Sequence, residues 1–530
     1  MPTPLEHVRE RLCAIESHTA SYCIPTLWLP PHTYAGVRRL QHPAAYYRAI
    51  IEQILSLPER SLRPQRRQKE LFYLAPVRYL TAWDHCGTGE ISYAVSSDGW
   101  RQTGSLLKTI ALLPYLQSLG VTWLLLLPPT DHGRTRIKGT LGSPYAPRRH
   151  ATIEETLAEP ILELDAETQM AALVEACHRV GIGVVVELAL RVASLDCPLI
   201  AQHPEWFYWV RVDAPQPLSP PNFNPETLAT IERAVSNGTF DALPEPDERY
   251  RSLFTEPPVE VWSNSDGTFS GHTADGTLVC VPNAFADYPP NDTQPLWTDI
   301  TYFRLHNHPA YNYIAYNTIR YFASQLDGWE NRPLWEYLAS IAPSFIERFD
   351  VDGILLDMGH AFPRALLERI VTCTRSAKPS LLLIAESFDR NDPISTQLEF
   401  DAVVGDCWHH AHSIEAFRQY AVSLRTAPAL RFFASPDTHN TPRIATRGPN
   451  VAAYAYALCT QLPGGVPMIT CGSEFGERVP INTGLDFRPE ESAAYPPERL
   501  PLFSGCALSW DAPDVRLLSY VRSLYAQDRR

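Results

Sequence analysis

The sequence predicts an α/β fold, a closed (β/α)8 barrel of the TIM type, and two observations support this prediction. From residue 71 onward, short apolar runs without polar alternation follow amphipathic helical segments, which is typical of parallel strands covered on both faces. The runs number eight, and they lie near residues 77, 123, 185, 355, 383, 403, 432 and 468. Eight strands that alternate with helices predict a barrel.

The chain before the barrel is predicted to form a helical N-terminal extension, residues 1–70. Two sets of apolar side chains recur there at helical spacing, namely Leu5, Val8, Leu12 and Ile15, and then Tyr46 or Tyr47, Ile50, Ile51, Ile54 and Leu55. Such stripes indicate packing against a core and predict nothing about function.

The barrel is predicted to cover residues 71–530, with a first strand from Leu71 to Trp83. Helices are expected at 106–119, 167–180, 334–349, 364–375, 413–424, 451–461 and 515–525. Residues 195–303 interrupt the alternation after the third strand, and they are rich in Pro, Asn, Asp and aromatic residues. A stretch this long inside a compact fold predicts a small inserted domain or a lid. No C-terminal β-domain is expected, because the last helix reaches almost to residue 530.

Composition narrows the function classes. With 45% hydrophobic and 20% charged residues, the chain resembles an ordinary globular protein. The formal net charge of −14 argues against a nucleic-acid partner and against an anionic membrane. We see no signal peptide and no apolar run of transmembrane length. The eleven cysteines are scattered without a C-x-x-C pair, which favours a reducing compartment, the cytoplasm, over a disulfide framework or a zinc site.

Three acids follow predicted strands: Asp357 after the fourth, Glu386 after the fifth and Asp437 after the seventh. In an α/β barrel, the catalytic groups lie at the carboxyl ends of the strands. Two carboxyl groups that face each other across a cleft can cleave a glycosidic bond. One attacks the anomeric carbon, and the other protonates the leaving oxygen and later activates the acceptor. For each acid alone, a helix N-cap or a surface charge is an equally good interpretation.

Several motifs resemble those of the α-amylase superfamily, glycoside hydrolase family 13, and within it the maltosyltransferase branch. Asp352 to Pro363, D-G-I-L-L-D-M-G-H-A-F-P, resembles the nucleophile motif, and Ile384-Ala385-Glu386 resembles the acid/base motif. Further segments that fit are 138–145, 203–209, 441–447 and 465–487. The resemblance covers about residues 72–525.

The resemblance implies Asp357 as nucleophile, Glu386 as general acid/base and Asp437 as the carboxylate that holds sugar hydroxyls. It places these residues in the sugar-binding cleft: His360, Arg443, Tyr145 and Lys138. It also implies a substrate, an α-1,4-glucan or maltooligosaccharide, with maltose 1-phosphate as an alternative donor. Neither a cofactor nor a metal is expected. The sequence does not decide the donor, the oligomeric state or the balance between transfer and hydrolysis.

The chain departs from the family pattern at the position two residues before the nucleophile. The family has an arginine there, which keeps the nucleophile ionised and oriented through charge-assisted bonds, and this chain has Leu355. Arg191 or Arg447 could substitute from a neighbouring strand end, and we include Arg191 among the expected substrate-binding residues. Glu187 stands where the third strand usually ends in Asp.

A second departure concerns the third carboxylate. If the family motif is aligned from its N-terminal side, Ser435-Pro436-Asp437-Thr438 supplies Asp437 as the third carboxylate, and His439-Asn440 is an insertion. If the motif is aligned from its C-terminal side, His439-Asn440 replaces the usual His-Asp, and the acid has become the amide Asn440. We favour Asp437, because Ser-Pro-Asp-Thr fits the maltosyltransferase branch.

Two hypotheses of different classes follow. The first is a retaining α-glucan-active enzyme that transfers maltosyl units through a covalent glycosyl-enzyme, with hydrolysis as a side reaction. The second is a catalytically degenerate family member that binds α-glucan or a partner protein without turnover, and Leu355 motivates it.

Overall fold

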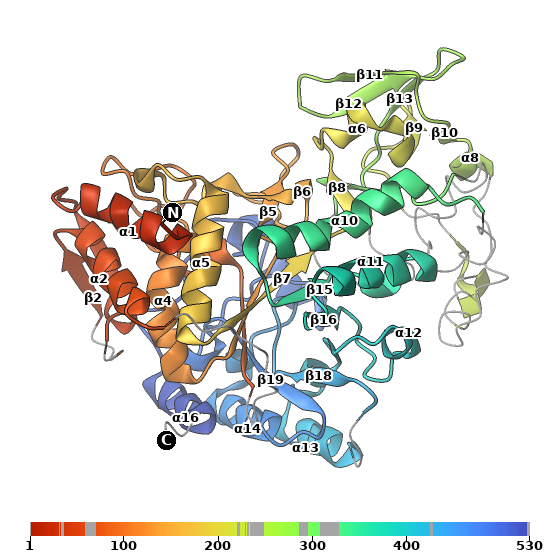
Figure 1. The fold of residues 1–530 in the computed structure, drawn as a ribbon. Coiled ribbons are helices and arrows are strands. Elements are labelled where there is room, and N and C mark those ends of the chain that lie inside the picture. The colour runs from red at the N-terminus through yellow and green to blue at the C-terminus, as the bar shows by residue number, and fades with distance from the viewer. Residues whose placement is uncertain are drawn as a thin grey trace.

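The structure is a computed structural model of the 530-residue chain. It describes residues 2–30, 32, 36–58, 70–219, 223–227, 229–230, 233, 248–285, 295–307, 328–424 and 428–526. Figure 1 shows helices packed around a central barrel, with the N-terminal helices on one side and a small sheet projecting from the opposite upper corner.

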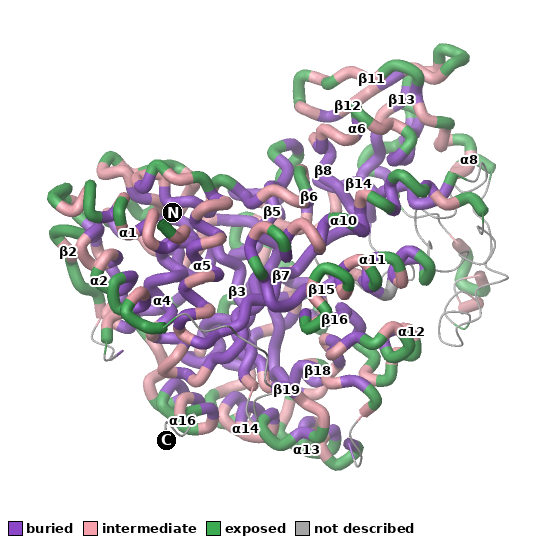
Figure 2. The backbone as a smooth tube through the Cα atoms, in the orientation of Figure 1, coloured by how far each residue is buried: buried purple, intermediate pink, exposed green. Residues whose placement is uncertain are grey.

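The eight predicted strands are present and close into one parallel barrel, which confirms the predicted fold class. They are β3 (Phe72–Ala75), β4 (Trp123–Leu126), β7 (Gly183–Leu188), β15 (Gly353–Leu356), β16 (Leu382–Ala385), β17 (Ala402–Val403), β18 (Arg431–Ala434) and β19 (Gly465–Thr470). Each strand pairs with the next along the chain, and β19 returns to pair with β3. Buried residues therefore concentrate at the centre of the molecule (Figure 2).

The helices that cover the barrel lie close to their predicted positions. They are α4 (Leu106–Leu119), α5 (Ala166–Val180), α10 (Arg332–Phe349), α11 (Arg364–Ala377), α13 (Ile414–Ser423), α14 (Pro449–Cys459) and α16 (Val515–Tyr525). Local chemistry fixes the ends of α5: the Asp165 side chain accepts the Thr168 N–H at its start, and Gly181 adopts a left-handed conformation after its end. The chain can therefore turn directly from α5 into β7.

The first strand is shorter than the sequence indicates. We expected it to extend from Leu71 to Trp83, but β3 ends at Ala75 and the chain turns at Pro76 into a short helix, α3 (Val77–Leu80). Proline lacks the N–H that a central strand must donate, so the ladder stops there. The residues of α3 are all buried, and a short buried helix cannot be told from a strand by apolar content alone.

The interrupting region contains a five-stranded antiparallel sheet in the order β10-β9-β13-β12-β11. Its strands are β9 (Trp209–Arg211), β10 (Phe254–Thr255), β11 (Glu260–Ser263), β12 (Phe269–His272) and β13 (Leu278–Cys280). Beside it, β8 (Val192–Ser194) pairs with β14 (Ile300–Tyr302), so both ends of the region lie next to the end of β7. The domain boundaries at residues 195 and 303 stay a prediction.

The N-terminal region contains α1 (Pro4–Ala14) and α2 (Pro43–Leu55), which pack on each other and on α5. A two-stranded sheet of β1 (Tyr22–Pro25) and β2 (Val37–Leu40) was not expected.

A hairpin of β5 (Thr130–His132) and β6 (Pro147–Ile153) holds the loop 133–146 above the barrel. Among the described residues, further short α-helices are α6 (Leu199–Gln202), α8 (Glu248–Arg251), α12 (Pro393–Gln397) and α15 (Pro489–Ala493). No helix in the described ranges is long and apolar enough to cross a membrane.

The first residue of β15 offers a test of the barrel packing. A Cβ at Gly353 would lie 2.8 Å from Val185 Cγ2 and 3.1 Å from the Leu382 carbonyl oxygen. Because overpacking typically costs about 1–3 kcal/mol, Gly353→Ala should lower the urea midpoint of unfolding. The cost should be smaller in a Val185→Ala background, which removes the closest contact. Gly359→Ala is the matched control, since its nearest contacts are at 3.8 Å. Equal midpoints for Gly353→Ala and this control would contradict the packing described.

Candidate active site

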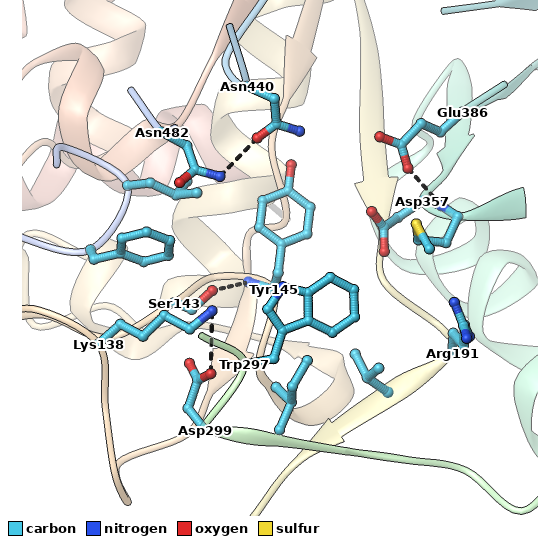
Figure 3. Close-up of a pocket in the computed structure, with 15 residues that line it drawn as sticks. Lys138, Ser143, Tyr145, Arg191, Trp297, Asp299, Asp357, Glu386, Asn440 and Asn482 are labelled. Atoms are coloured by element: carbon cyan, nitrogen blue, oxygen red, sulfur yellow. Dashed lines mark hydrogen bonds and ion pairs between the residues drawn. The ribbon is translucent and has the colours of Figure 1, made fainter. Parts of the chain in front are cut away.

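A cleft of about 660 Å³, partly open to solvent, lies at the carboxyl ends of the barrel strands. Five of the residues predicted from the sequence line it: Lys138, Tyr145, Arg191, Asp357 and Glu386. They come from four separate parts of the chain, because Lys138 and Tyr145 belong to the loop between β5 and β6, Arg191 follows β7, Asp357 follows β15 and Glu386 follows β16. Figure 3 shows the two acids together on one side of the cleft.

The backbone holds the two acids at neighbouring strand ends. The Asp357 N–H donates to the Leu188 carbonyl at 3.2 Å, and the Glu386 N–H donates to the Leu356 carbonyl at 3.0 Å. The Glu386 side chain is oriented as well, since Oε2 accepts the Met358 N–H at 2.8 Å. The ladder that joins β7, β15 and β16 therefore places the two residues at adjacent strand ends.

The electrostatics of Asp357 are those of a crowded carboxyl group. Burial raises the pKa of Asp357 well above its usual range, and the charge of Glu386 and a hydrogen bond to Glu386 raise this pKa further. Arg191 opposes these effects. A carboxyl group beside another one ionises less easily, so Asp357 retains its proton to a higher pH than an isolated aspartate. One acid and one base side by side are what an exchange of glycosidic bonds requires.

Glu187, which sequence reasoning treated only as a departure at the third strand end, is a third member of the carboxyl cluster. It lies on β7 and pairs in register with Leu355 of β15. Burial raises the pKa of Glu187 well above its usual range, and the charges of Asp357 and Glu386 act in the same direction. A hydrogen bond with Tyr145 acts in the opposite direction. Its position at a barrel strand end was the signal that could have identified it.

Tyr145 stands in the middle of the cleft between the acids and the loop residues (Figure 3). Its hydroxyl lies 3.0 Å from His439 Nε2. Burial lowers the pKa of His439 to about 3, so this imidazole is neutral at pH 7. Tyr145 thus connects the carboxyl cluster to the segment after β18 through uncharged hydrogen-bonding groups.

The other end of the cleft combines one ion pair with aromatic surface. Lys138 Nζ lies 3.5 Å from Asp299 Oδ1 and 5.1 Å from the centre of the Phe503 ring. Burial raises the pKa of Asp299, and Lys138 opposes this. Trp297 lies across the cleft near this pair (Figure 3). Aromatic faces beside a few fixed polar groups suit a sugar, which has apolar faces and a polar rim.

Asp437 and Arg443 follow β18, and both side chains are buried there. Asp437 is fully buried, and its Oδ2 accepts the Ile444 N–H at 2.8 Å and the Ser473 hydroxyl at 2.7 Å. Arg443 is also fully buried and donates to the Val479 carbonyl at 3.0 Å. Neither residue is among those that line the cleft. Their roles in binding sugar hydroxyls stay predictions.

Asn440 lines the cleft instead, and the Asn482 side-chain amide donates to its Oδ1 at 2.9 Å (Figure 3). The cause is a tight turn after β18: the Thr438 N–H donates to the Thr441 hydroxyl at 2.8 Å, which separates the directions of Asp437 and Asn440. The predicted contact of His360 lies outside the described side chains. Within the described residues, no group of three or more His, Cys, Asp or Glu side chains could hold a metal ion.

Comparison with known sequences gives a short match. No family model matches the chain. An α-1,4-glucan:maltose-1-phosphate maltosyltransferase from Cereibacter sphaeroides (strain ATCC 17023) is 30% identical over 123 residues, which is 21% of this chain and 18% of the relative. A second protein of that name from Cereibacter sphaeroides is 31% identical over 116 residues, or 20% of this chain and 19% of the relative. The match thus spans less than a fifth of the length of either relative.

Comparison with solved structures gives a long match at low identity. A debranching enzyme from Nostoc punctiforme, in an acarbose-soaked crystal, has a TM-score of 0.51 and 14% identity, covering 87% of this chain and 81% of that chain. A maltogenic α-amylase from Thermotoga neapolitana has a TM-score of 0.49 and 17% identity, covering 86% and 75%. The chain thus shares its barrel fold with the debranching enzyme, and over about a fifth of its length its sequence is similar to maltosyltransferases.

Proposed function

We propose that the chain is a retaining α-glucan-active enzyme that transfers maltosyl units between α-1,4-glucans through a covalent glycosyl-enzyme. The observation that carries this proposal is the pair Asp357 and Glu386, which follow adjacent strands and share a hydrogen bond in one cleft. A hydrogen-bonded pair of carboxyl groups favours direct attack by one of them. An inverting enzyme instead needs a wider gap that holds a water molecule.

The chemistry assigned to the pair balances in two steps. Asp357 attacks the anomeric carbon, the bond from that carbon to the leaving glucan oxygen breaks, and the Glu386 proton moves to that oxygen. A hydroxyl of the acceptor glucan then attacks the same carbon, gives its proton to Glu386 and releases the Asp357 carboxylate. The Met358 N–H that binds Glu386 Oε2 keeps the general acid oriented through both steps.

The maltosyl unit and the donor are supported by the Cereibacter sphaeroides relatives, whose name specifies maltose 1-phosphate and α-1,4-glucan. We extend this to the present chain with an α-1,4-glucan as donor and acceptor, and with maltose 1-phosphate as the alternative donor. The aromatic and ion-paired end of the cleft, formed by Trp297, Lys138 and Asp299, supports a sugar ligand there.

A second candidate function is α-glucan or partner-protein binding without turnover. Two observations favour it: Leu355 replaces an arginine of the family pattern, and the cleft presents Asn440 rather than an acid at its third position. Both candidates use the same cleft, so they differ only in whether a bond is exchanged.

The first test of the proposal is product analysis with maltoheptaose, with and without maltose 1-phosphate. Wild type should give products spaced by two glucose units. Asp357→Asn and Glu386→Gln should each lower turnover roughly 10³- to 10⁶-fold, because each removes one partner of the two-step exchange. Unchanged thermal midpoints of unfolding would show that both variants fold. Glucan binding by wild type without any product would instead support the second candidate.

The second test asks which of two residues, Asp437 or Asn440, acts on the substrate in the cleft. Asp437→Asn should keep turnover within about threefold and change stability little, because its amide oxygen can still accept the Ile444 and Ser473 donors. Asp437→Ala should destabilise the fold by about 1–3 kcal/mol, since both buried donors lose their acceptor. Asn440→Ala should lower kcat/KM for maltoheptaose without changing the urea midpoint. A loss of turnover beyond about 100-fold in a stable Asp437→Asn variant would restore Asp437 as a catalytic acid.

A further inference from the structure

Strand β15, which precedes Asp357, has no positively charged side chain. Leu355 stands two residues earlier on β15, so its side chain lies on the same face as Asp357. Its in-register neighbour on β7 is Glu187, and both side chains are buried. An aliphatic chain and a third carboxyl group thus lie under the predicted nucleophile.

Arg191 reaches the same place from the end of the neighbouring strand. It lies between β7 and β8, lines the cleft with Asp357 and Glu386, and is only 3% exposed. Its guanidinium points toward the two acids in Figure 3.

Two contacts to β14 and its end fix Arg191 in this position. The Arg191 carbonyl accepts the Phe303 N–H at 3.2 Å. The guanidinium carbon lies 4.5 Å from the centre of the Tyr302 ring. A planar cation stacked on a ring is pre-organised, because it loses little further freedom when it binds a carboxylate. Arg191 is therefore part of the built site and not a mobile surface arginine.

The charges that face Asp357 come from every element packed around it. The carboxyl groups are Glu386 from the end of β16 and Glu187 from β7, and the Tyr145 hydroxyl approaches from the loop before β6. Arg191 is the cation that lowers the Asp357 pKa among the side chains the structure describes. Lys138 lies at the other end of the cleft against Asp299 (Figure 3).

We propose that Arg191 is a positioning residue that takes over the task of the arginine missing at Leu355. This inference rests on the proposed function. A cation supplied by the end of the third strand, instead of by the fourth, favours the ionised, attacking form of Asp357 and its direction toward the anomeric carbon. Leu355 is then tolerated because the cation has moved to a neighbouring strand end.

The inference predicts that an arginine at position 191 or at position 355 can supply the positive charge next to Asp357. Arg191→Leu should lower kcat roughly 10²- to 10³-fold with little change in KM, as expected when a charge acts on the transition state and not on ground-state binding. Arg191→Lys should recover part of this loss. The exchange variant Arg191→Leu/Leu355→Arg should recover at least about tenfold over Arg191→Leu.

The pH dependence has a definite sign. Asp357 must be ionised to attack, and loss of a neighbouring cation raises its pKa. The acidic limb of the kcat/KM profile should therefore move to higher pH in Arg191→Leu and move back in the exchange variant. Arg447→Leu is the matched control, because the sequence offered Arg447 as an equal alternative and its charge acts instead on Glu491. This control should leave the profile unchanged.

A second readout needs no turnover. A water-soluble carbodiimide with an amine modifies protonated carboxyl groups, and mass spectrometry of the peptide that contains Asp357 follows its labelling against pH. Labelling should persist to higher pH in Arg191→Leu and in Arg191→Gln, a second charge-removing variant, than in wild type and Arg447→Leu. Thermal melts identify any variant that fails to fold.

The outcomes are distinguishable. If wild type forms no product, the proposed function fails, and the labelling profile still decides whether Arg191 holds Asp357 ionised. If wild type turns over substrate but Arg191→Leu and Arg191→Gln match Arg447→Leu in both profiles, the inference about Arg191 is overturned while the proposed function stands. A shifted profile that the exchange variant reverses supports both.

Discussion

The candidate site depends on one constraint, the crowding of negative charge at the carboxyl end of the barrel. Glu187, Asp357 and Glu386 come from three neighbouring barrel strands, β7, β15 and β16, whose hydrogen-bonded register places the three residues side by side. Two unit charges 4 Å apart repel by about 4 kcal/mol at an effective dielectric constant of 20. The cluster must therefore retain protons or hold a cation close by, and these are the conditions that acid–base chemistry needs.

The barrel was predictable from the sequence because its strands carry a simple physical signature. A strand such as Trp123–Leu126, buried on both faces, is an unbroken apolar run, and a helix end such as Gly181 marks where the next strand starts. The same signature failed at Val77–Leu80, where a buried helix after Pro76 has the same apolar content as a strand. Apolar content reports burial, and periodicity distinguishes helix from strand only over longer segments.

The site was less predictable than the fold, because sequence order gives the strand end on which an acid lies but not the direction of its side chain. Asp357 and Glu386 follow their strands immediately, so the ladder fixes their direction. Asp437 stands three residues after β18, and a turn held by side-chain hydrogen bonds directs it into the core and Asn440 into the cleft. Trp297 and Asn482 belong to the cleft only because distant loops meet there, which local pattern cannot reveal.

The direction of a side chain, which sequence order does not give, also decides what a departure from a sequence motif means. Leu355 at a position that usually holds arginine suggests a disabled site when the motif is considered alone. Electrostatic stabilisation depends on where a charge lies in space, however, and not on which residue number supplies it. In a barrel, the end of each strand borders the ends of two others, so a side chain from β7 can reach the surroundings of Asp357 as well as one from β15 can. Loss of an arginine from one strand end is therefore evidence against catalysis only when the neighbouring strand ends offer no cation, and here Arg191 lines the same cleft.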